Sequence, residues 1–132
     1  MERFKNWKKP IIKEGKLTKY NWMVQNVKNF ELGSQTDIGA FSYFNAKNGI
    51  VIEDQVQIGS HVSVYSASTI DKKNGKVILR KNCKIGAHST IMPGVTVGEN
   101  SIIGAHSFIN KSIPKNVVAV GAPVKVIRKI KS

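Results

Sequence analysis

Branched and aromatic apolar side chains return at every sixth position through most of this chain, and the spacing changes at only two places. A helix would repeat these side chains about every 3.6 residues and a flat strand would alternate them, so neither explains the period. Short strands joined by sharp turns into stacked coils do explain it, and the pattern predicts an all-β, parallel β-helix. The positions that mark the period are Ile38, Phe44, Ile52, Ile58, Val64, Ile70, Leu79, Ile85, Ile91, Val97, Ile103 and Ile109.

A second column of small or β-branched residues follows ten of the twelve markers by four positions. We expect both columns to point inward and to form the core of the coils. A glycine directly follows five of the markers, where a corner needs either a positive φ or room for the backbone of the next coil. The second column consists of Ser42, Val56, Val62, Ser68, Cys83, Ser89, Val95, Ser101, Ser107 and Ile113.

We expect residues 1–132 to form a single domain with three parts. Residues 1–33 lack the period but contain Trp7 and Trp22, and they are predicted to form an irregular cap. Residues 34–114 are predicted to form about four coils, interrupted by two extra residues in NAKNG and three in DKKNGK. Residues 115–132 are expected to leave the coil, turn at Gly121 and pack back over the last coil as a short basic tail.

The chain carries a strong positive net charge. Lysine and arginine number 21 against 8 acidic residues, which gives a formal net charge of +13. This excess favours anionic partners such as phosphorylated small molecules, although lysine used for solubility is an equally simple explanation. The cations form no stripe interleaved with aromatics, so we expect no nucleic-acid partner. No apolar stretch approaches the length of a membrane span and no secretory signal is visible, so we expect a cytoplasmic protein, with Cys83 as a buried thiol.

Two segments carry a family resemblance that covers residues 38–130. The run PGVTVG at 93–98 and the pattern IP…VVAVGAP…VIR at 113–128 resemble the hexapeptide-repeat acyltransferases, in particular galactoside and maltose O-acetyltransferases and nucleotide-sugar N-acetyltransferases. The resemblance implies a left-handed β-helix and a homotrimer. It also implies that acetyl-CoA lies in a cleft between neighbouring subunits, that no metal is needed, and that the acceptor is a sugar or nucleotide sugar, as in surface-polysaccharide or nucleotide-sugar metabolism.

The resemblance also implies a set of coenzyme-binding residues. Small side chains would floor a groove for the pantetheine arm, the residues after the last full coil would contact the coenzyme, and a basic pair would lie near its phosphates. Each of these residues also has a purely structural explanation, as a corner, a close contact between coils or a solvated face. The residues are Gly59, Ala87 and Ala105 for the groove, Asn110 and Lys111 after the coil, and Lys125 and Arg128 for the phosphates.

The general base expected from the family is absent, because the equivalent position holds Thr69. The remaining candidates are His61 and His88, each at the third place after a marker, where side chains face outward. Counting hexads places His88 and His106 on one side of the prism and His61 on another, so that His61 of one subunit would face His88 of a neighbour. Asn45 matches the family asparagine that holds the acceptor or the oxyanion, or else serves only a tight turn.

The chemistry leaves several alternatives open. A neutral amine attacks a thioester without a base, whereas a sugar hydroxyl does not, so the acceptor is either a hydroxyl or an amino group. Three histidines on a β-helix also suggest a γ-carbonic-anhydrase-like zinc enzyme, although that family spaces two ligands five residues apart and the closest pair here is 18 apart. A non-catalytic scaffold is the third alternative. The sequence favours an acetyl-CoA-dependent sugar acetyltransferase.

Overall fold

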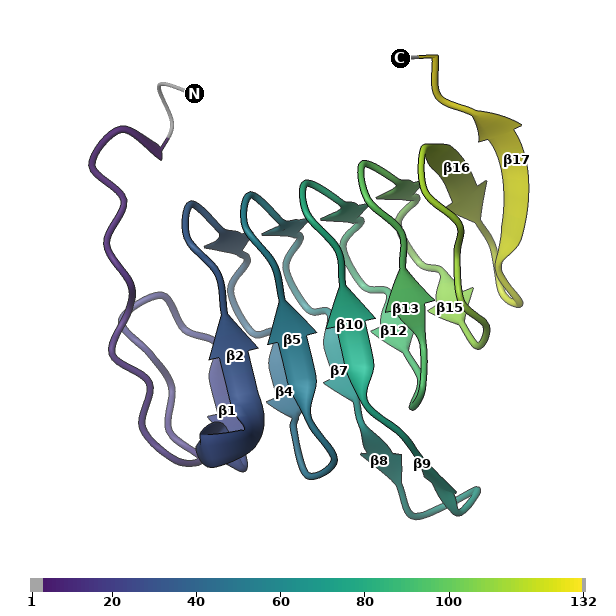
Figure 1. Ribbon diagram of the computed structural model, residues 1–132. Helices are drawn as coiled ribbons and strands as arrows, with labels where there is room; N and C mark the ends of the chain where they lie inside the picture. The colour runs from purple at the N-terminus through teal and green to yellow at the C-terminus, as the bar shows by residue number, and fades with distance from the viewer. Residues whose placement is uncertain (1–3, 132) are drawn as a thin grey trace.

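The computed structural model describes residues 4–131 and shows a three-sided solenoid whose coils stack in parallel (Figure 1). Three sheets form the sides. The first contains β1, β4, β7, β12 and β15, the second β2, β5, β10 and β13, and the third β3, β6, β11, β14, β16 and β17. The strands of the first sheet are Met23–Gln25, Tyr43–Asn45, Ser63–Tyr65, Thr90–Ile91 and Phe108–Ile109. Those of the second are Phe30–Leu32, Ile50–Ile52, Val77–Leu79 and Thr96–Val97, and those of the third are Asp37–Ile38, Gln57–Ile58, Lys84–Ile85, Ile102–Ile103, Val117–Val120 and Lys125–Lys129.

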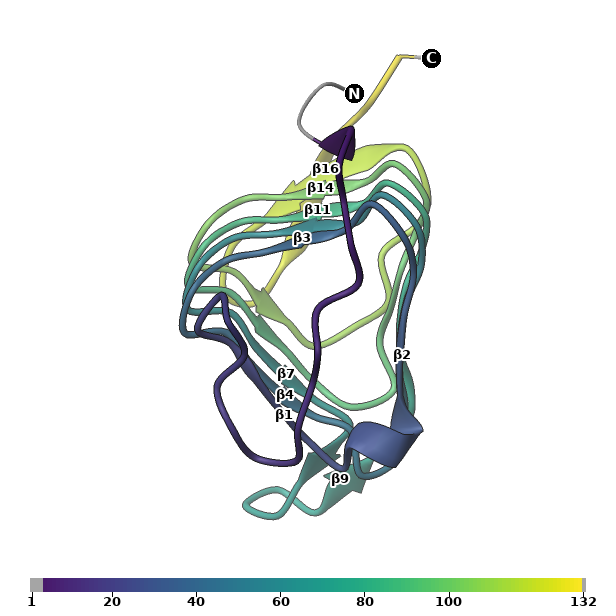
Figure 2. The same ribbon diagram turned by 90° about the vertical axis from the view of Figure 1, so that its left-hand side faces the viewer.

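The inward columns form the core as the period predicts. Val64 of β7 pairs with Ile91 of β12, which pairs in turn with Ile109 of β15, so identical positions of successive coils lie directly above one another. Eleven of the twelve markers are buried, and so are nine of the ten residues in the second column. Seen from the N-terminal end, the chain runs counter-clockwise from β2 to β3 to β4 as it recedes (Figure 2), so the β-helix is left-handed.

The solenoid has about five coils, not four, because it begins inside the segment predicted to be cap. Strands β1 and β2 stack on β4 and β5. The spacing of Val24, Leu32 and Ile38 repeats that of Phe44, Ile52 and Ile58 twenty residues later. Aromatic rings add to the core here, because Trp22, Phe30 and Phe44 contact one another with ring centroids 5.4–6.3 Å apart.

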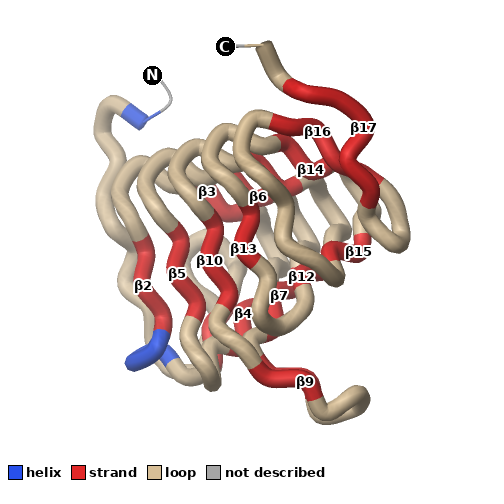
Figure 3. Tube along the Cα trace, turned by 45° about the vertical axis from the view of Figure 1, so that its right-hand side comes forward, coloured by secondary structure: helices blue, strands red, loops and turns tan. Residues whose placement is uncertain are grey.

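Ile70 is the one marker that the structure contradicts. It is 97% exposed and belongs to a hairpin of β8 (Ala67–Ser68) and β9 (Lys73–Asn74) that projects from the prism (Figure 3). The excursion therefore adds nine residues and not three, since Val64 and Leu79 are separated by fifteen residues where a regular pair needs six. All differences in coil length fall at this one corner, between the first and second sheets.

Both ends of the solenoid are covered. At the C-terminal end, β16 pairs parallel with β14 and continues the third sheet, so the chain does not leave the coil at residue 115 as predicted. It turns at Gly121, after which β17 pairs antiparallel with β16. At the other end, the segment before β1, of which residues 4–22 are described, runs across the first coil (Figure 2). There the Glu14 carboxylate accepts hydrogen bonds from the backbone N–H groups of Asn26 and Val27, on either side of the start of the short 3₁₀ helix η2 (Val27–Asn29).

The described residues contain no helix with the length and hydropathy needed to cross a bilayer.

Candidate active site

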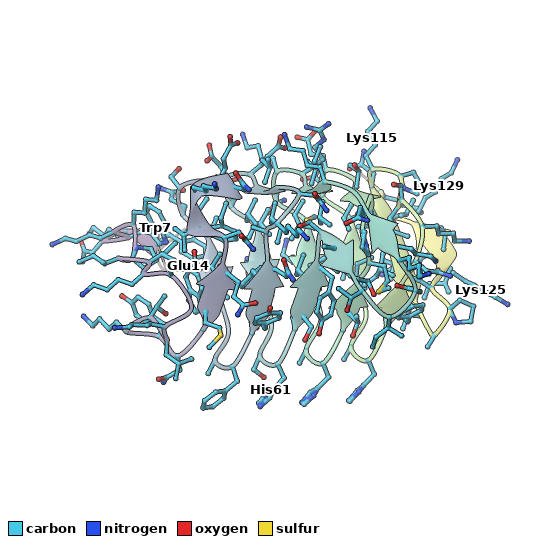
Figure 4. All side chains as sticks on the ribbon, turned by 90° about the horizontal axis from the view of Figure 1, so that it is seen from below. Trp7, Glu14, His61, Lys115, Lys125 and Lys129 are labelled. Atoms are coloured by element: carbon cyan, nitrogen blue, oxygen red, sulfur yellow. The ribbon has the colours of Figure 1, made fainter. Side chains whose placement is uncertain are left out.

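Three histidines form a stacked ladder along the corner between the third and first sheets. The ring centroids of His61 and His88 are 4.7 Å apart, those of His88 and His106 are 4.9 Å apart, and the ring planes differ by 4° and 8°. Phe41 continues the ladder one coil earlier, with its ring centroid 5.5 Å from that of His61. All four side chains are exposed, and Figure 4 shows His61 projecting from the edge of the prism.

The backbone explains why these rings point outward. Each of the four residues has a positive φ, between 57° and 64°, which is the left-handed conformation of a tight corner. Backbone hydrogen bonds connect neighbouring corners, as from the His88 N–H to the Ser60 carbonyl and from the His106 N–H to the Ala87 carbonyl. The imidazoles are therefore held by a repeated corner and not by a flexible loop.

The prediction that His61 lies on a different side from His88 is wrong. The nine-residue excursion makes the third coil 27 residues long, so Ile58 pairs with Ile85 and the two histidines that follow them occupy the same corner. The prediction failed because it treated Ile70 as a buried marker of the repeat, which assigned the positions on either side of the hairpin to the wrong sides of the prism. The shared motif Ile-Gly-x-His at 58–61 and 85–88 would have indicated the common position.

The outward face of the first sheet continues from the ladder. Asn45 ends β4 and is half-buried, and its Oδ1 accepts a hydrogen bond from the Lys47 N–H at 3.1 Å. One column nearer the ladder, Tyr43 lies 5.8 Å from Tyr65 between ring centroids, and its hydroxyl is hydrogen-bonded to the Gln25 side chain. Partial burial and the neighbouring Tyr65 raise the pKa of Tyr43. The sequence reasoning missed this cluster of amide and phenol groups, whose only signal is outward alternation along two strands.

The predicted groove residues divide into two neighbouring columns. Ala87 and Ala105 occupy equivalent positions directly beside the histidine ladder, whereas Gly59 lies one position earlier in its corner. A Cβ on Gly59 would lie 2.7 Å from the Ala87 nitrogen, and the φ of Gly59 is not positive. Close approach of the next coil is therefore sufficient to require glycine here, while Ala87 and Ala105 form a narrow strip of small side chains.

The basic pair of the tail lies on one face of its strand because of a β-bulge. Lys125 pairs with Val120 and Arg128 pairs with Val118, and the register shifts between these pairs. Residues three apart in a regular strand face opposite sides, but the extra residue at Ile127 returns Arg128 to the side of Lys125. Asn110 and Lys111 are exposed directly after β15, in the same C-terminal part of the prism.

The hairpin of β8 and β9 directly follows β7, at the edge of the first sheet that lies away from the histidine ladder. Thr69 lies exposed on this hairpin. The Asn48 amide fastens the hairpin to the preceding coil, because its Nδ2 donates to the Ser66 carbonyl and to Asn74 Oδ1, both at 2.9 Å. The buried Ser66 hydroxyl donates to the Asn45 carbonyl at 2.7 Å. Asn45 is thus part of a hydrogen-bonded turn as well as a candidate ligand for an acceptor.

Two further predictions concern reactive groups. Cys83 is fully buried, and burial raises its pKa to about 12, so it is an inert thiol and not a nucleophile. Within residues 4–131, no group of three histidine, cysteine, aspartate or glutamate side chains is arranged to hold a metal ion.

The comparisons with known proteins agree with this geometry. Residues 76–111 match the sequence profile described as "Bacterial transferase hexapeptide (six repeats)". Galactoside O-acetyltransferase of Escherichia coli strain K12 is 40% identical over 116 residues, a match that covers 76% of this chain and 57% of that enzyme.

Two solved structures extend the comparison. A galactoside acetyltransferase in complex with coenzyme A superposes with a TM-score of 0.76 at 30% identity, covering 83% of this chain and 60% of that one. AntD, an N-acyltransferase from Bacillus cereus in complex with dTDP-4-amino-4,6-dideoxyglucose and coenzyme A, gives a TM-score of 0.61 at 30% identity, covering 85% and 72%.

The left-handed stack of six-residue repeats is the type of β-helix found in bacterial hexapeptide transferases. This chain belongs to the family of hexapeptide-repeat acyltransferases. It spans about half the length of the curated relatives it matches.

Proposed function

We propose that this protein transfers an acetyl group from acetyl-CoA to a hydroxyl or amino group of a sugar. The observation that carries the proposal is the ladder of exposed imidazoles beside the strip of small residues. Imidazole is suited to take a proton near neutral pH, and a narrow apolar strip suits the thin pantetheine arm. The acetyltransferase and N-acyltransferase relatives support the reaction class and the sugar acceptor.

In the proposed reaction the acceptor oxygen or nitrogen attacks the carbonyl carbon of the thioester. His61 or His88 removes the acceptor's proton as the new C–O or C–N bond forms. The tetrahedral intermediate then collapses, the C–S bond breaks, and the imidazolium returns its proton to the departing coenzyme thiolate. The Asn45 amide would bind the acceptor or donate to the oxyanion, which is where a preorganised donor stabilises the transition state most.

The coenzyme would extend from the ladder toward the C-terminal end of the prism. Its pantetheine arm would run along Ala87 and Ala105, and Asn110 and Lys111 would contact its middle part. Lys125 and Arg128 lie together on one strand face, where two cations suit a phosphate group. Gly59 lies one position before this strip, and coil packing also requires a glycine there.

We propose a homotrimer in which a neighbouring subunit covers the face that bears the ladder. In one subunit the imidazoles are open to solvent, so a thioester bound there would be exposed to water. A neighbour would supply the second wall of a crevice and exclude that water. Sedimentation equilibrium would give three times the mass of 14.6 kDa if this is correct, and a monomer would contradict it.

The activity can be tested with a panel of sugars and amino sugars in a thiol-release assay. The assay has little background from the protein, because its one cysteine is buried and its pKa is raised to about 12. Thiol release above that of the acceptor-free control supports the proposal. The separate binding test is a thermal shift with acetyl-CoA, which must stabilise the folded state by about 2.7 kcal/mol at a hundred times Kd. A protein that neither binds acetyl-CoA nor releases thiol would be a scaffold.

A further inference from the structure

The segment before the first coil carries three exposed apolar side chains close together. Ile11 is 80% exposed, and Leu17 and Tyr20 are each 52% exposed. They line one shallow hollow of about 460 Å³ at the N-terminal end of the prism. Exposed aliphatic side chains that cluster in this way mark an interaction surface more often than scattered ones do.

The same hollow is surrounded by cations. Four lysines line it, Lys8, Lys9, Lys13 and Lys19, and its described lining contains no acidic side chain. Residues 5–19 contain six lysines and one acidic residue, Glu14. That carboxylate is turned toward the first coil, where it accepts two backbone hydrogen bonds at 2.8 and 2.9 Å, so it does not neutralise the hollow.

The segment is anchored, so the exposure of its apolar side chains does not come from a loose chain. The Trp7 indole N–H donates to the Thr36 carbonyl at 2.8 Å, and the Gly15 N–H donates to the Val24 carbonyl at 2.9 Å. Thr18 is buried, and its N–H donates to the Trp22 carbonyl. Leu17 and Tyr20 flank these attachment points and are held outward.

We propose that this surface, formed by Ile11, Leu17, Tyr20 and the four surrounding lysines, docks the protein on an anionic lipid bilayer. An aliphatic centre with a cationic rim matches the boundary between acyl chains and anionic headgroups, and tyrosine is favoured at that boundary. A nucleic acid would engage the lysines but gain nothing from Ile11 and Leu17. A second copy of this chain would bring the same cations together and be repelled.

The position of the surface leaves the proposed reaction undisturbed. Trp7 and Glu14 lie at one end of the prism, and Lys125 lies at the other (Figure 4). Docking would therefore leave the coenzyme-binding tail away from the lipid. The inference does not depend on the proposed function, and it can hold for a protein with any activity.

Flotation with phospholipid vesicles tests the proposal. The full chain is expected to float with vesicles that contain phosphatidylglycerol and to remain behind with vesicles of phosphatidylcholine alone, with binding lost at high salt. The double variant Lys8→Gln/Lys13→Gln should lower the partition coefficient roughly fivefold for each lysine. The double variant Ile11→Ser/Leu17→Ser, which keeps every charge, should lower it by about tenfold or more.

Matched controls come from the hairpin of β8 and β9. Ile70 is more exposed than Ile11 and lies near Lys72 and Lys73, so Ile70→Ser and Lys72→Gln/Lys73→Gln should leave partitioning unchanged. The proposal is overturned if the full chain does not bind anionic vesicles, or if Ile11→Ser/Leu17→Ser binds them as tightly as the parent. Equal loss in the hairpin variants would also overturn it, since net charge alone would then govern binding. An unchanged thermal unfolding temperature confirms that each variant is folded.

Discussion

The imidazoles of His61 and His88 lie face to face, 4.7 Å apart between ring centroids and 4° from parallel, although 27 residues separate them in the chain. They therefore occupy one corner of a single chain, and not the two different sides that the hexad count predicted. An acceptor placed over this corner can reach either ring, so the two histidines must be separated by substitution.

We predict that exchanging His61 or His88 for asparagine lowers kcat/KM for a hydroxyl acceptor by about 10²- to 10⁴-fold in at least one case. Asparagine is the suitable replacement because both residues have a positive φ, which it tolerates better than alanine does. His106→Asn is the matched control from the same ladder. If all three variants keep full activity with the hydroxyl acceptor, no histidine is the base. If they keep it only with an amino acceptor, an amine that needs no base becomes the better explanation.

The tail should affect coenzyme affinity and not the chemical step. Lys125→Gln and Arg128→Gln are each predicted to raise KM for acetyl-CoA roughly three- to tenfold, because each removes a cation from a phosphate group. Lys129→Gln, on the opposite face of β17, should have little effect. Acetyl-pantetheine lacks the phosphates, so the parent and both variants should use it equally well. A variant that loses activity equally with both donors would place these residues elsewhere in the mechanism.

Gly59→Ala should lower the free energy of unfolding by about 1–3 kcal/mol, because the added Cβ would overlap the backbone of the next coil. That Cβ would lie 2.7 Å from the Ala87 nitrogen and 3.2 Å from the Ala87 Cβ. Ser60→Ala in the same corner is the control and should change stability by less than about 0.5 kcal/mol. Denaturant unfolding measures both. Unchanged stability with a raised KM for acetyl-CoA would instead favour a direct role of this glycine in the groove.

Cys83 should make the protein less stable in alkali. Burial raises its pKa from 9.0 to about 12, so above pH 9 the unfolded chain loses this proton while the folded chain keeps it. Stability is thus fully present below pH 9 and falls by up to about 1.4 kcal/mol per pH unit as the pH rises toward 12. Cys83→Ala removes this contribution, and the slope of unfolding free energy against pH should be shallower than that of the parent. Parallel slopes would mean that the folded thiol ionises normally.

Much of the fold could be predicted because its core repeats a single interaction. A sixfold period of apolar residues arises when each coil buries the same positions, and Phe44 and Val64 are indeed fully buried. The first coil was missed because its markers Val24 and Leu32 are eight residues apart and not six, so a sixfold count does not detect them. Ile70 misled the count because an isolated isoleucine at the expected phase carries no signal that its loop leaves the prism.

The candidate site was harder to predict than the core. Outward positions are free to vary, and counting six residues at a time from His61 to His88 fails because the coil between them has nine additional residues. The shared Ile-Gly-x-His motif is the signal that places both histidines at one corner. Lys125 and Arg128 lie on the same face of β17 only because of a β-bulge. Their spacing of three residues would place them on opposite faces of a regular strand. Tyr43 and Tyr65 come together across strands, and no spacing along the chain signals their contact.

The confinement of every length difference to one corner has an evolutionary consequence. The nine-residue excursion that forms β8 and β9 emerges without changing the register of any sheet. Insertions at that corner leave the rest of the architecture intact, so this appendage can diversify while the scaffold stays constant. Exchange of this single module is therefore expected to cost the remainder little stability, because the entropy of closing a surface loop rises only slowly with its length.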